Sequence, residues 1–311
     1  MNPYSYINNQ PKAELRLKRD TSNSLHYSMR FPSAFNTGYP ENSMVRGEYY
    51  RPKLRNKTPL VILVHGMGDL SVIPCKLLAR PLLRQGIACF VLYLTVHSSR
   101  IPEAMGRHLP YLTSEEWFQS YQLSVVNIRQ ILDWAHSRPE LDEKQVAVLG
   151  ISFGGFVSSI AMGVDTRIKT GVFIVTGGNS EKMTWLSKAS PYRKRYQRTE
   201  AEYLNIQNSY AKYLLEVSEK GFESVTPVRQ SFLTDPLTFA SYLKGRPVLM
   251  LNAAWDKYIP REAVTEFWQA CGRPTIKWIP SGHASIWLWY PTIRRHIIGF
   301  LKSYLQVFTK T

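Results

Sequence analysis

The sequence is poor in cysteine, in acidic residues and in long apolar runs. Among its 311 residues there are three cysteines, Cys75, Cys89 and Cys271, which lie far apart and form no CxxC pair. An odd number of widely spaced cysteines argues against a disulfide framework and against a structural zinc site. We therefore expect a protein of a reducing compartment, and we predict a cytoplasmic location.

Long apolar segments are also lacking. No stretch reaches the roughly 18 to 20 apolar residues that a membrane-spanning helix needs. The first residues are polar and lead into Lys12, Arg16, Lys18 and Arg19 with no apolar segment of the kind found in secretion signals. We thus expect no secretion signal and no stable membrane insertion. The hydrophobic fraction of 44% and the aromatic fraction of 13% predict a folded chain with a sizeable core.

Acidic residues are few, 23 against 39 Lys and Arg, so the formal net charge is +16. A basic balance favours nucleic acid or an anionic membrane as a partner when the charges are clustered. Here they are spread along the chain, and the one tight cluster is Arg193, Lys194, Arg195 and Arg198. Because no helix-turn-helix, RNP or zinc-finger pattern accompanies them, we predict no nucleic-acid partner and interpret the charge as a basic surface.

What the sequence does contain is a regular alternation of apolar runs and helical patterns. Leu60–Val64 is apolar throughout, which is typical of a strand buried on both faces. Further strands are predicted at Ile87–Leu94, Val146–Leu149, Thr170–Thr176, Pro247–Asn252 and Thr275–Ile279. Helices are predicted at Ile73–Gln85, Ser114–His136 (with Ser114 as its N-cap), Gly154–Gly163, Arg261–Ala270 and Thr292–Phe308. This order predicts an α/β fold with a mostly parallel, doubly wound sheet, since parallel neighbours need crossover connections.

Two parts of the chain do not show this alternation of strand and helix patterns. Residues 1–44 are polar, and we expect an N-terminal extension with one strand near Leu25–Met29. Residues 177–246 are long, charged and rich in tyrosine, and they predict an insertion over the edge of the sheet. The expected core therefore comprises residues 45–176 and 247–311.

The strongest local motif is Gly150-Ile-Ser152-Phe-Gly154-Gly155, between a predicted strand and a predicted helix. A G-x-S-x-G turn holds its serine in a strained conformation with Oγ exposed above the sheet, and the glycines avoid Cβ clashes. The N–H of Phe153, at the positive end of the helix, is suited to stabilise a developing oxyanion. An ordinary strand-to-helix turn is the alternative interpretation of the motif.

A serine nucleophile also needs a base, an acid and a second oxyanion donor. His283 and Asp256 each follow a predicted strand, where open α/β sheets place their ligands. The His65-Gly66 turn exposes the N–H of Met67 as the second donor, and we expect His65 itself to be structural. Asp235 is an alternative acid, but it precedes a strand, so we prefer Asp256.

The chain order Ser152, Asp256, His283 is that of α/β-hydrolases. From about Leu60 to Phe300 the sequence resembles an α/β-hydrolase superfamily enzyme of the esterase and lipase kind, on the strength of His65-Gly66, the serine turn, Asp256–Pro260 and Gly282-His283. The resemblance implies a sheet of about eight mostly parallel strands and a cap inserted after the sixth strand, where residues 177–246 lie.

These observations together predict a serine hydrolase that cleaves a carboxylic ester of a small or medium-sized substrate through an acyl-enzyme. Acyltransferase, thioesterase and peptidase activity with the same triad remain alternatives, as does, less favoured, a non-catalytic binding protein. Neither a metal nor an organic cofactor is expected. Trp287, His97 and Trp185 are candidate substrate contacts, with core packing or an ordinary turn as their alternative roles. The oligomeric state is not predicted.

Overall fold

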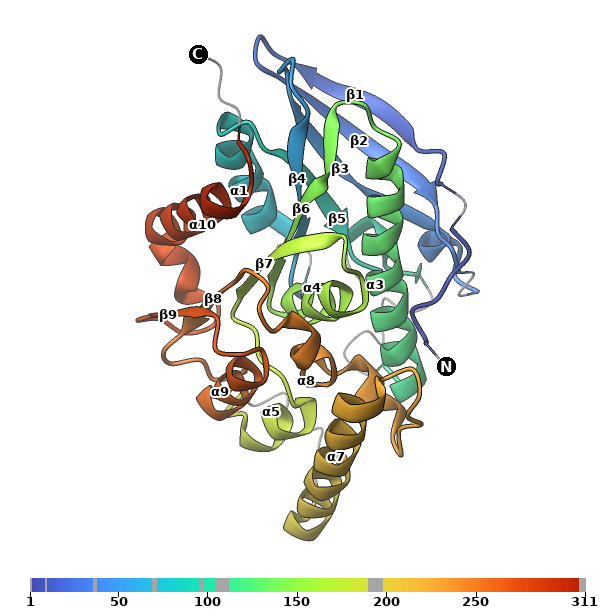
Figure 1. The fold of residues 1–311 in the computed structure, drawn as a ribbon, viewed down its shortest axis with the longest axis vertical. Helices are drawn as coiled ribbons and strands as arrows, with labels where there is room; N and C mark the ends of the chain where they lie inside the picture. Colours follow the sequence, from blue (N-terminus) through green and yellow to red (C-terminus); the bar gives the residue numbers. More distant parts are fainter. Residues whose placement is uncertain are drawn as a thin grey trace.

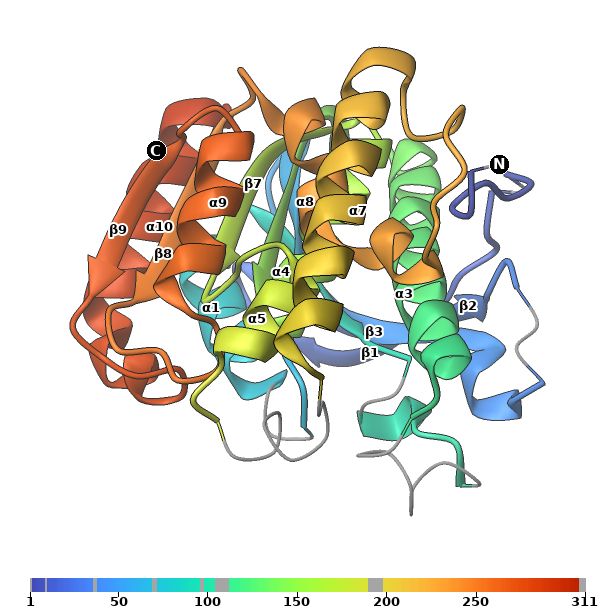
Figure 2. The same cartoon turned by 90° about the horizontal axis from the view of Figure 1, so that it is seen from below.

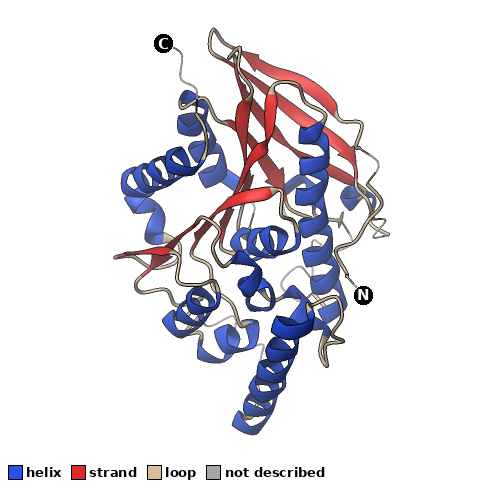
Figure 3. Ribbon diagram, viewed as in Figure 1, coloured by secondary structure: helices blue, strands red, loops and turns tan. Residues whose placement is uncertain are grey.

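In the described part of the chain, a nine-stranded sheet forms the centre of the fold, with helices on both of its faces (Figures 1 and 3). The computed structural model describes residues 2–8, 10–35, 38–68, 72–95, 98–103, 112–189 and 198–307. The strands are β1 Glu14–Asp20, β2 Ser24–Pro32, β3 Met44–Pro52, β4 Thr58–Val64, β5 Ala88–Tyr93, β6 Leu141–Ile151, β7 Ile168–Ile174, β8 Val248–Ala253 and β9 Thr275–Ile279. Their order in the sheet is β1-β2-β3-β5-β4-β6-β7-β8-β9.

The six neighbouring strands β5, β4, β6, β7, β8 and β9 pair in parallel. Helices lie in the segments of chain that connect them. The α-helices are α1 Val72–Arg84, α3 Ser114–His136, α4 Phe153–Val164, α5 Ser180–Leu186, α7 Glu200–Lys220, α8 Pro236–Phe239, α9 Arg261–Ala270 and α10 Tyr290–Tyr304. Short 3-10 turns are η1 Pro40–Asn42, η3 Ser98–Arg100, η5 Gln230–Thr234, η6 Ala240–Leu243 and η7 Ser285–Trp289. The predicted α/β architecture with a mostly parallel sheet is confirmed.

Every residue of β4 is buried, as its apolar run predicts. Because successive side chains of a strand point to opposite faces, β4 contributes to two cores. Leu60, Ile62 and Val64 pack in one core with side chains of α3 and α4. Val61 and Leu63 pack in the other with side chains of α1 and α10. Figure 1 shows α1 and α10 on one side of the sheet and α3 and α4 on the other.

The N-terminal region differs from the expected extension with one strand. It supplies both β1 and β2, which continue the sheet beyond β3 in antiparallel pairing. The strand expected near Leu25–Met29 lies within β2. β1 has the sequence ELRLKRD and is largely exposed, so it shows no buried alternation from which a strand could be predicted. Charged side chains on such an edge strand discourage pairing with another chain.

The insertion between β7 and β8 contains α5, α7, η5, α8 and η6. Helices α5 and α7 contact each other, and Figure 2 shows them side by side. Helix α8 packs against α4, and residues of α5 and η5 line the cavity that contains Ser152. The insertion therefore borders the region above the carboxyl ends of the parallel strands. In the described residues no helix is long and apolar enough to cross a membrane.

Candidate active site

Ser152 lies at the turn between β6 and α4, and its backbone is strained. Its φ of 52° and ψ of −118° are rare for a residue with a side chain, and such conformations cost about 1–3 kcal/mol. The Ser152 N–H donates to the carbonyl of Ile174 at 2.8 Å, and its own carbonyl accepts from Gly155 N–H at 2.8 Å. The side chain makes no helix-capping bond, so Oγ is available for other contacts.

The glycines of the turn permit this geometry because the backbone approaches its neighbours closely. A Cβ on Gly150 would lie 2.3 Å from the carbonyl oxygen of Gly154, and one on Gly154 would lie 2.3 Å from that of Val64. A Cβ on Gly155 would lie 1.9 Å from Thr176 Oγ1. The glycine positions of the motif are thus steric requirements of the turn.

Ser152, His283 and Asp256 form a continuous hydrogen-bonded chain. His283 Nε2 lies 2.9 Å from Ser152 Oγ, and His283 Nδ1 lies 2.7 Å from Asp256 Oδ2. The other oxygen of Asp256, Oδ1, accepts from the N–H groups of Tyr258 at 2.8 Å and Ile259 at 3.0 Å. This is the arrangement in which a carboxylate orients an imidazole toward a serine hydroxyl.

The strands β8 and β9 bring the acid and the base together. Asp256 lies in the loop after β8, and His283 lies in the loop after β9, at the same edge of the sheet. Backbone bonds join the two loops: Ala254 N–H donates to Ile279 at 2.8 Å, and Trp255 N–H donates to Ser281 at 2.9 Å. The histidine and aspartate are therefore positioned by paired backbone as well as by their own contact.

Asp235, the alternative acid, occupies a different role. It is buried at the N-terminus of α8, and its carboxylate accepts from the N–H groups of Asn179 at 2.8 Å, Leu237 at 2.9 Å and also Ser180. Burial raises the pKa of Asp235, although these backbone donors act in the opposite direction. The carboxylate caps α8 and meets the start of α5, whereas His283 contacts Asp256.

The loop after β4 lies beside the serine. A Cβ on Gly66 would lie 3.3 Å from Ser152 Cβ, so the His65-Gly66 turn is directly next to the serine turn. His65 is fully buried; its Nδ1 lies 2.8 Å from the Gly66 carbonyl, and its Nε2 accepts from Leu94 N–H at 3.1 Å. The histidine thus shapes the loop, as its expected structural role requires. Met67 and Phe153 both line the cavity that contains Ser152.

A cavity of about 1230 Å³ opens at Ser152 and His283. One part of its wall is aromatic: Phe153 packs edge-on against Tyr121 at 4.9 Å and Trp117 at 5.7 Å between ring centroids. The wall continues through Phe156 and Phe232. These aromatic residues were not expected at the site, because the spacing of Trp117 and Tyr121 on a helix is equally typical of core packing. Their proximity to the serine depends on how α3 crosses the sheet.

The three candidate substrate contacts are placed differently. Trp287 lines the cavity with His283. Trp185 is not one of the lining residues and stacks on Tyr203, with ring centroids 4.8 Å apart. His97 lies outside the described residues, as do the basic residues 193–195. Within the described chain, no group of three or more His, Cys, Asp or Glu side chains is arranged to hold a metal ion.

Comparisons with known proteins agree with this fold. The family model described as "Alpha/beta hydrolase domain containing 18" matches residues 4–302. None of the curated proteins compared with the chain matches it.

Among solved structures, an acetyl xylan esterase from a Paenibacillus species is similar with a TM-score of 0.69 and 19% identity, over 96% of this chain and 91% of that one. An acetyl xylan esterase from a Thermoanaerobacterium species is similar with a TM-score of 0.61 and 17% identity, over 93% of this chain and 88% of that one. A cold-adapted esterase from an Arctic intertidal metagenomic library is similar with a TM-score of 0.59 and 15% identity, over 94% of this chain and 98% of that one. At these identities the likeness concerns the fold.

Proposed function

The chain belongs to the alpha/beta hydrolase domain containing 18 family, and on that premise we propose that it is a serine hydrolase that cleaves carboxylic esters through an acyl-enzyme. The observation that carries the proposal is the chain of contacts from Ser152 Oγ to His283 and on to Asp256, at 2.9 and 2.7 Å. The strained serine backbone and the adjacent cavity support it as well.

In the first step His283 Nε2 takes the proton of Ser152 as Oγ attacks the ester carbonyl carbon. Asp256 holds the imidazole in the required tautomer and stabilises the imidazolium. The N–H groups of Met67 and Phe153 stabilise the negative oxygen of the tetrahedral intermediate; loss of one such donor typically slows catalysis about 10²–10³-fold.

The intermediate collapses when the bond to the alcohol oxygen breaks and the imidazolium donates its proton to that oxygen. The alcohol leaves, and the acyl group remains on Ser152. A water molecule, deprotonated by His283, then attacks the acyl-enzyme and releases the carboxylic acid. The reaction consumes one water and returns the triad to its starting protonation state.

Hydrolysis of p-nitrophenyl acetate by the full chain tests the proposal. We expect wild-type protein to turn over and Ser152→Ala to lose about 10⁴-fold or more in kcat/KM while retaining its circular dichroism spectrum. Adding short alcohols to the same assay separates hydrolysis from acyl transfer, because a transferase forms a new ester. Activity of Ser152→Ala equal to wild type would overturn the proposal.

A further inference from the structure

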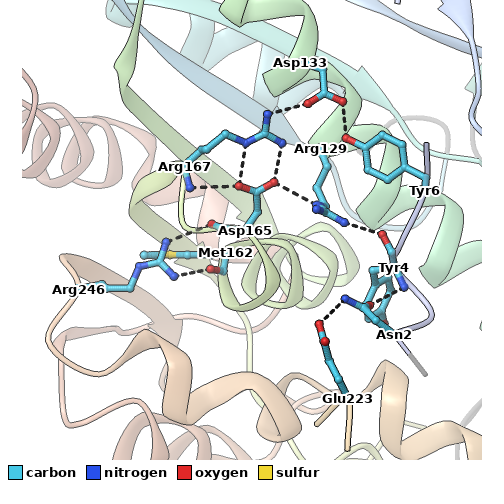
Figure 4. A network of polar contacts seen from close by, with 10 residues as sticks. All are labelled: Asn2, Tyr4, Tyr6, Arg129, Asp133, Met162, Asp165, Arg167, Glu223 and Arg246. Atoms are coloured by element: carbon cyan, nitrogen blue, oxygen red, sulfur yellow. Dashed lines mark hydrogen bonds and ion pairs between the residues drawn. The ribbon is translucent and has the colours of Figure 1, made fainter. Parts of the chain in front are cut away.

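The first residues of the described chain are held in place by a network of polar contacts, part of which Figure 4 shows through Asn2, Tyr4 and Tyr6. Tyr4 is fully buried. Its hydroxyl donates to the carbonyl of Leu233 at 2.6 Å, and its ring packs edge-on against Phe239 at 5.8 Å between centroids. A single side chain from the start of the chain thus contacts both η5 and α8, which belong to the insertion between β7 and β8.

A second set of contacts fixes the same segment to α3. Arg129 donates to the Tyr4 carbonyl at 2.5 Å, and its guanidinium lies 5.0 Å from the centre of the Tyr6 ring. The Tyr6 hydroxyl donates to Asp133, and Arg129 also binds Asp165 at 3.0 Å. Figure 4 shows the hydrogen bonds among these residues. The segment is therefore anchored independently of its contact with η5.

The turn η5 forms part of the wall of the substrate cavity. Gln230, Ser231, Phe232 and Thr234 line the cavity, whereas Leu233 does not. The Phe232 ring stacks on Tyr210, another lining residue, with centroids 4.4 Å apart. Tyr4 therefore binds the carbonyl of Leu233, whose two chain neighbours, Phe232 and Thr234, form part of the cavity wall.

The other hydrogen bonds that the structure describes for η5 are local. Phe232 N–H donates to Arg229, Thr234 Oγ1 donates to Ser231 at 3.0 Å, and Thr238 Oγ1 donates to the Phe232 carbonyl at 2.6 Å. Such bonds shape the turn, which also packs against α3 and α8. The bond from Tyr4 spans 229 positions of the sequence and joins the turn to the segment that α3 holds.

We propose that Tyr4 is a specificity-determining positioning residue: it holds η5, and with it Phe232, at the distance from Ser152 that admits larger apolar acyl groups. The proposal rests on the ester hydrolysis proposed above. The aromatic wall from Phe153 through Tyr121 provides the apolar surface for such a group. An acetyl group stays near Ser152 and does not depend on η5, whereas a longer acyl chain extends along the wall.

The test compares Tyr4→Phe with wild type on p-nitrophenyl acetate and p-nitrophenyl octanoate. The variant keeps the buried ring and loses one hydroxyl, so we expect it to fold. We expect KM for the octanoate to rise about 3- to 10-fold, the range for loss of one hydrogen bond, with kcat and KM for the acetate unchanged. Tyr6→Phe is the matched control. It removes a hydroxyl from the same segment, but that hydroxyl bonds Asp133 of α3 and does not bond η5.

Amide hydrogen exchange gives a second measurement that needs no turnover. Peptides covering residues 230–234 are expected to exchange faster in Tyr4→Phe and at the wild-type rate in Tyr6→Phe. Normal turnover with an unchanged ratio of the two KM values, or unchanged exchange of η5, would overturn the inference. Failure of the proposed function would look different, since wild type would then hydrolyse neither ester.

Discussion

At the scale of single residues, Asp256 and Asp235 show which part of the site can be predicted from sequence. Both aspartates lie in predicted loops, and the sequence favours Asp256 as the acid because it follows a strand, whereas Asp235 precedes one. In the structure Asp256 contacts His283, while Asp235 accepts backbone N–H groups at two helix starts. Ser152 and His283 were similarly predictable from strand ends. The cavity wall was not, because side chains such as Phe232 carry no local pattern.

Asp256→Asn is expected to reduce kcat about 10³- to 10⁴-fold with little change in melting temperature, because an amide disfavours the imidazole tautomer that activates Ser152. Asp235→Asn is its matched control. It replaces a buried carboxylate that accepts several N–H groups, so we expect a lower melting temperature and a kcat within a few-fold of wild type. Ester kinetics and thermal unfolding of both variants measure these two effects. An equal loss of kcat in the two variants would contradict the assigned roles of Asp256 and Asp235.

Gly155→Ala should destabilise the protein by about 1–3 kcal/mol, since its Cβ would collide with Thr176 Oγ1, 1.9 Å away. Gly299→Ala provides the comparison on α10, where a Cβ would meet nothing within 4 Å. Alanine in an exposed helix position is expected to stabilise by about 0.5–1 kcal/mol. Urea unfolding measures both changes, and an unaffected Gly155→Ala would refute the steric requirement.

At the scale of helices and strands, most elements of the core could be predicted because apolar runs and helical periodicity persist over many residues. The helix predicted at Ser114–His136 is α3 with the same bounds. Its N-cap, however, is Thr113 and not Ser114 as expected. Thr113 Oγ1 accepts from Glu116 N–H at 3.2 Å, and Glu116 in turn accepts from Thr113 N–H at 2.7 Å. Sequence alone cannot separate two adjacent hydroxyl residues, since both suit the cap.

Thr113→Ala is therefore expected to lower the free energy of unfolding by about 1 kcal/mol, because it removes the capping box of α3. Ser114→Ala should change it by less than about 0.5 kcal/mol, since Ser114 lies inside the helix and alanine is the better helix former. Chemical denaturation of the two single variants measures the difference. A larger loss for Ser114→Ala would show that the cap is assigned to the wrong residue.

At the scale of the whole molecule, Glu48 joins the antiparallel edge of the sheet to α1. Its carboxylate accepts from Tyr50 at 2.5 Å, from Tyr93 at 2.6 Å and from Lys76 at 2.7 Å, and it lies 3.0 Å from His26 Nε2. Burial by itself would raise the pKa of Glu48, but these partners outweigh it and hold the pKa well below its usual value. Strands β2, β3 and β5 and helix α1 thus meet at one carboxylate.

A carboxyl group with a lowered folded-state pKa stabilises the fold above its unfolded pKa, and this contribution is lost as pH falls. Glu48→Gln is therefore expected to melt below wild type at pH 7. The difference should narrow as pH falls below about 4.5, near the ordinary pKa of glutamate, because the carboxyl of the unfolded chain then binds a proton while the folded-state carboxylate stays ionised to lower pH. Melting curves between pH 3 and 7 follow this change. A difference independent of pH would contradict the role of the charge.

The central claim is that Ser152 is a nucleophile activated by His283 within this fold. Labelling of the full chain with a fluorophosphonate, followed by peptide mass mapping, tests it most directly because the probe forms a stable bond only with an activated hydroxyl. We predict one adduct per chain on Ser152, none on Ser152→Ala, and labelling about 10³-fold slower or more in His283→Ala. An adduct on another residue, or equal labelling of the Ser152→Ala variant, would contradict the account.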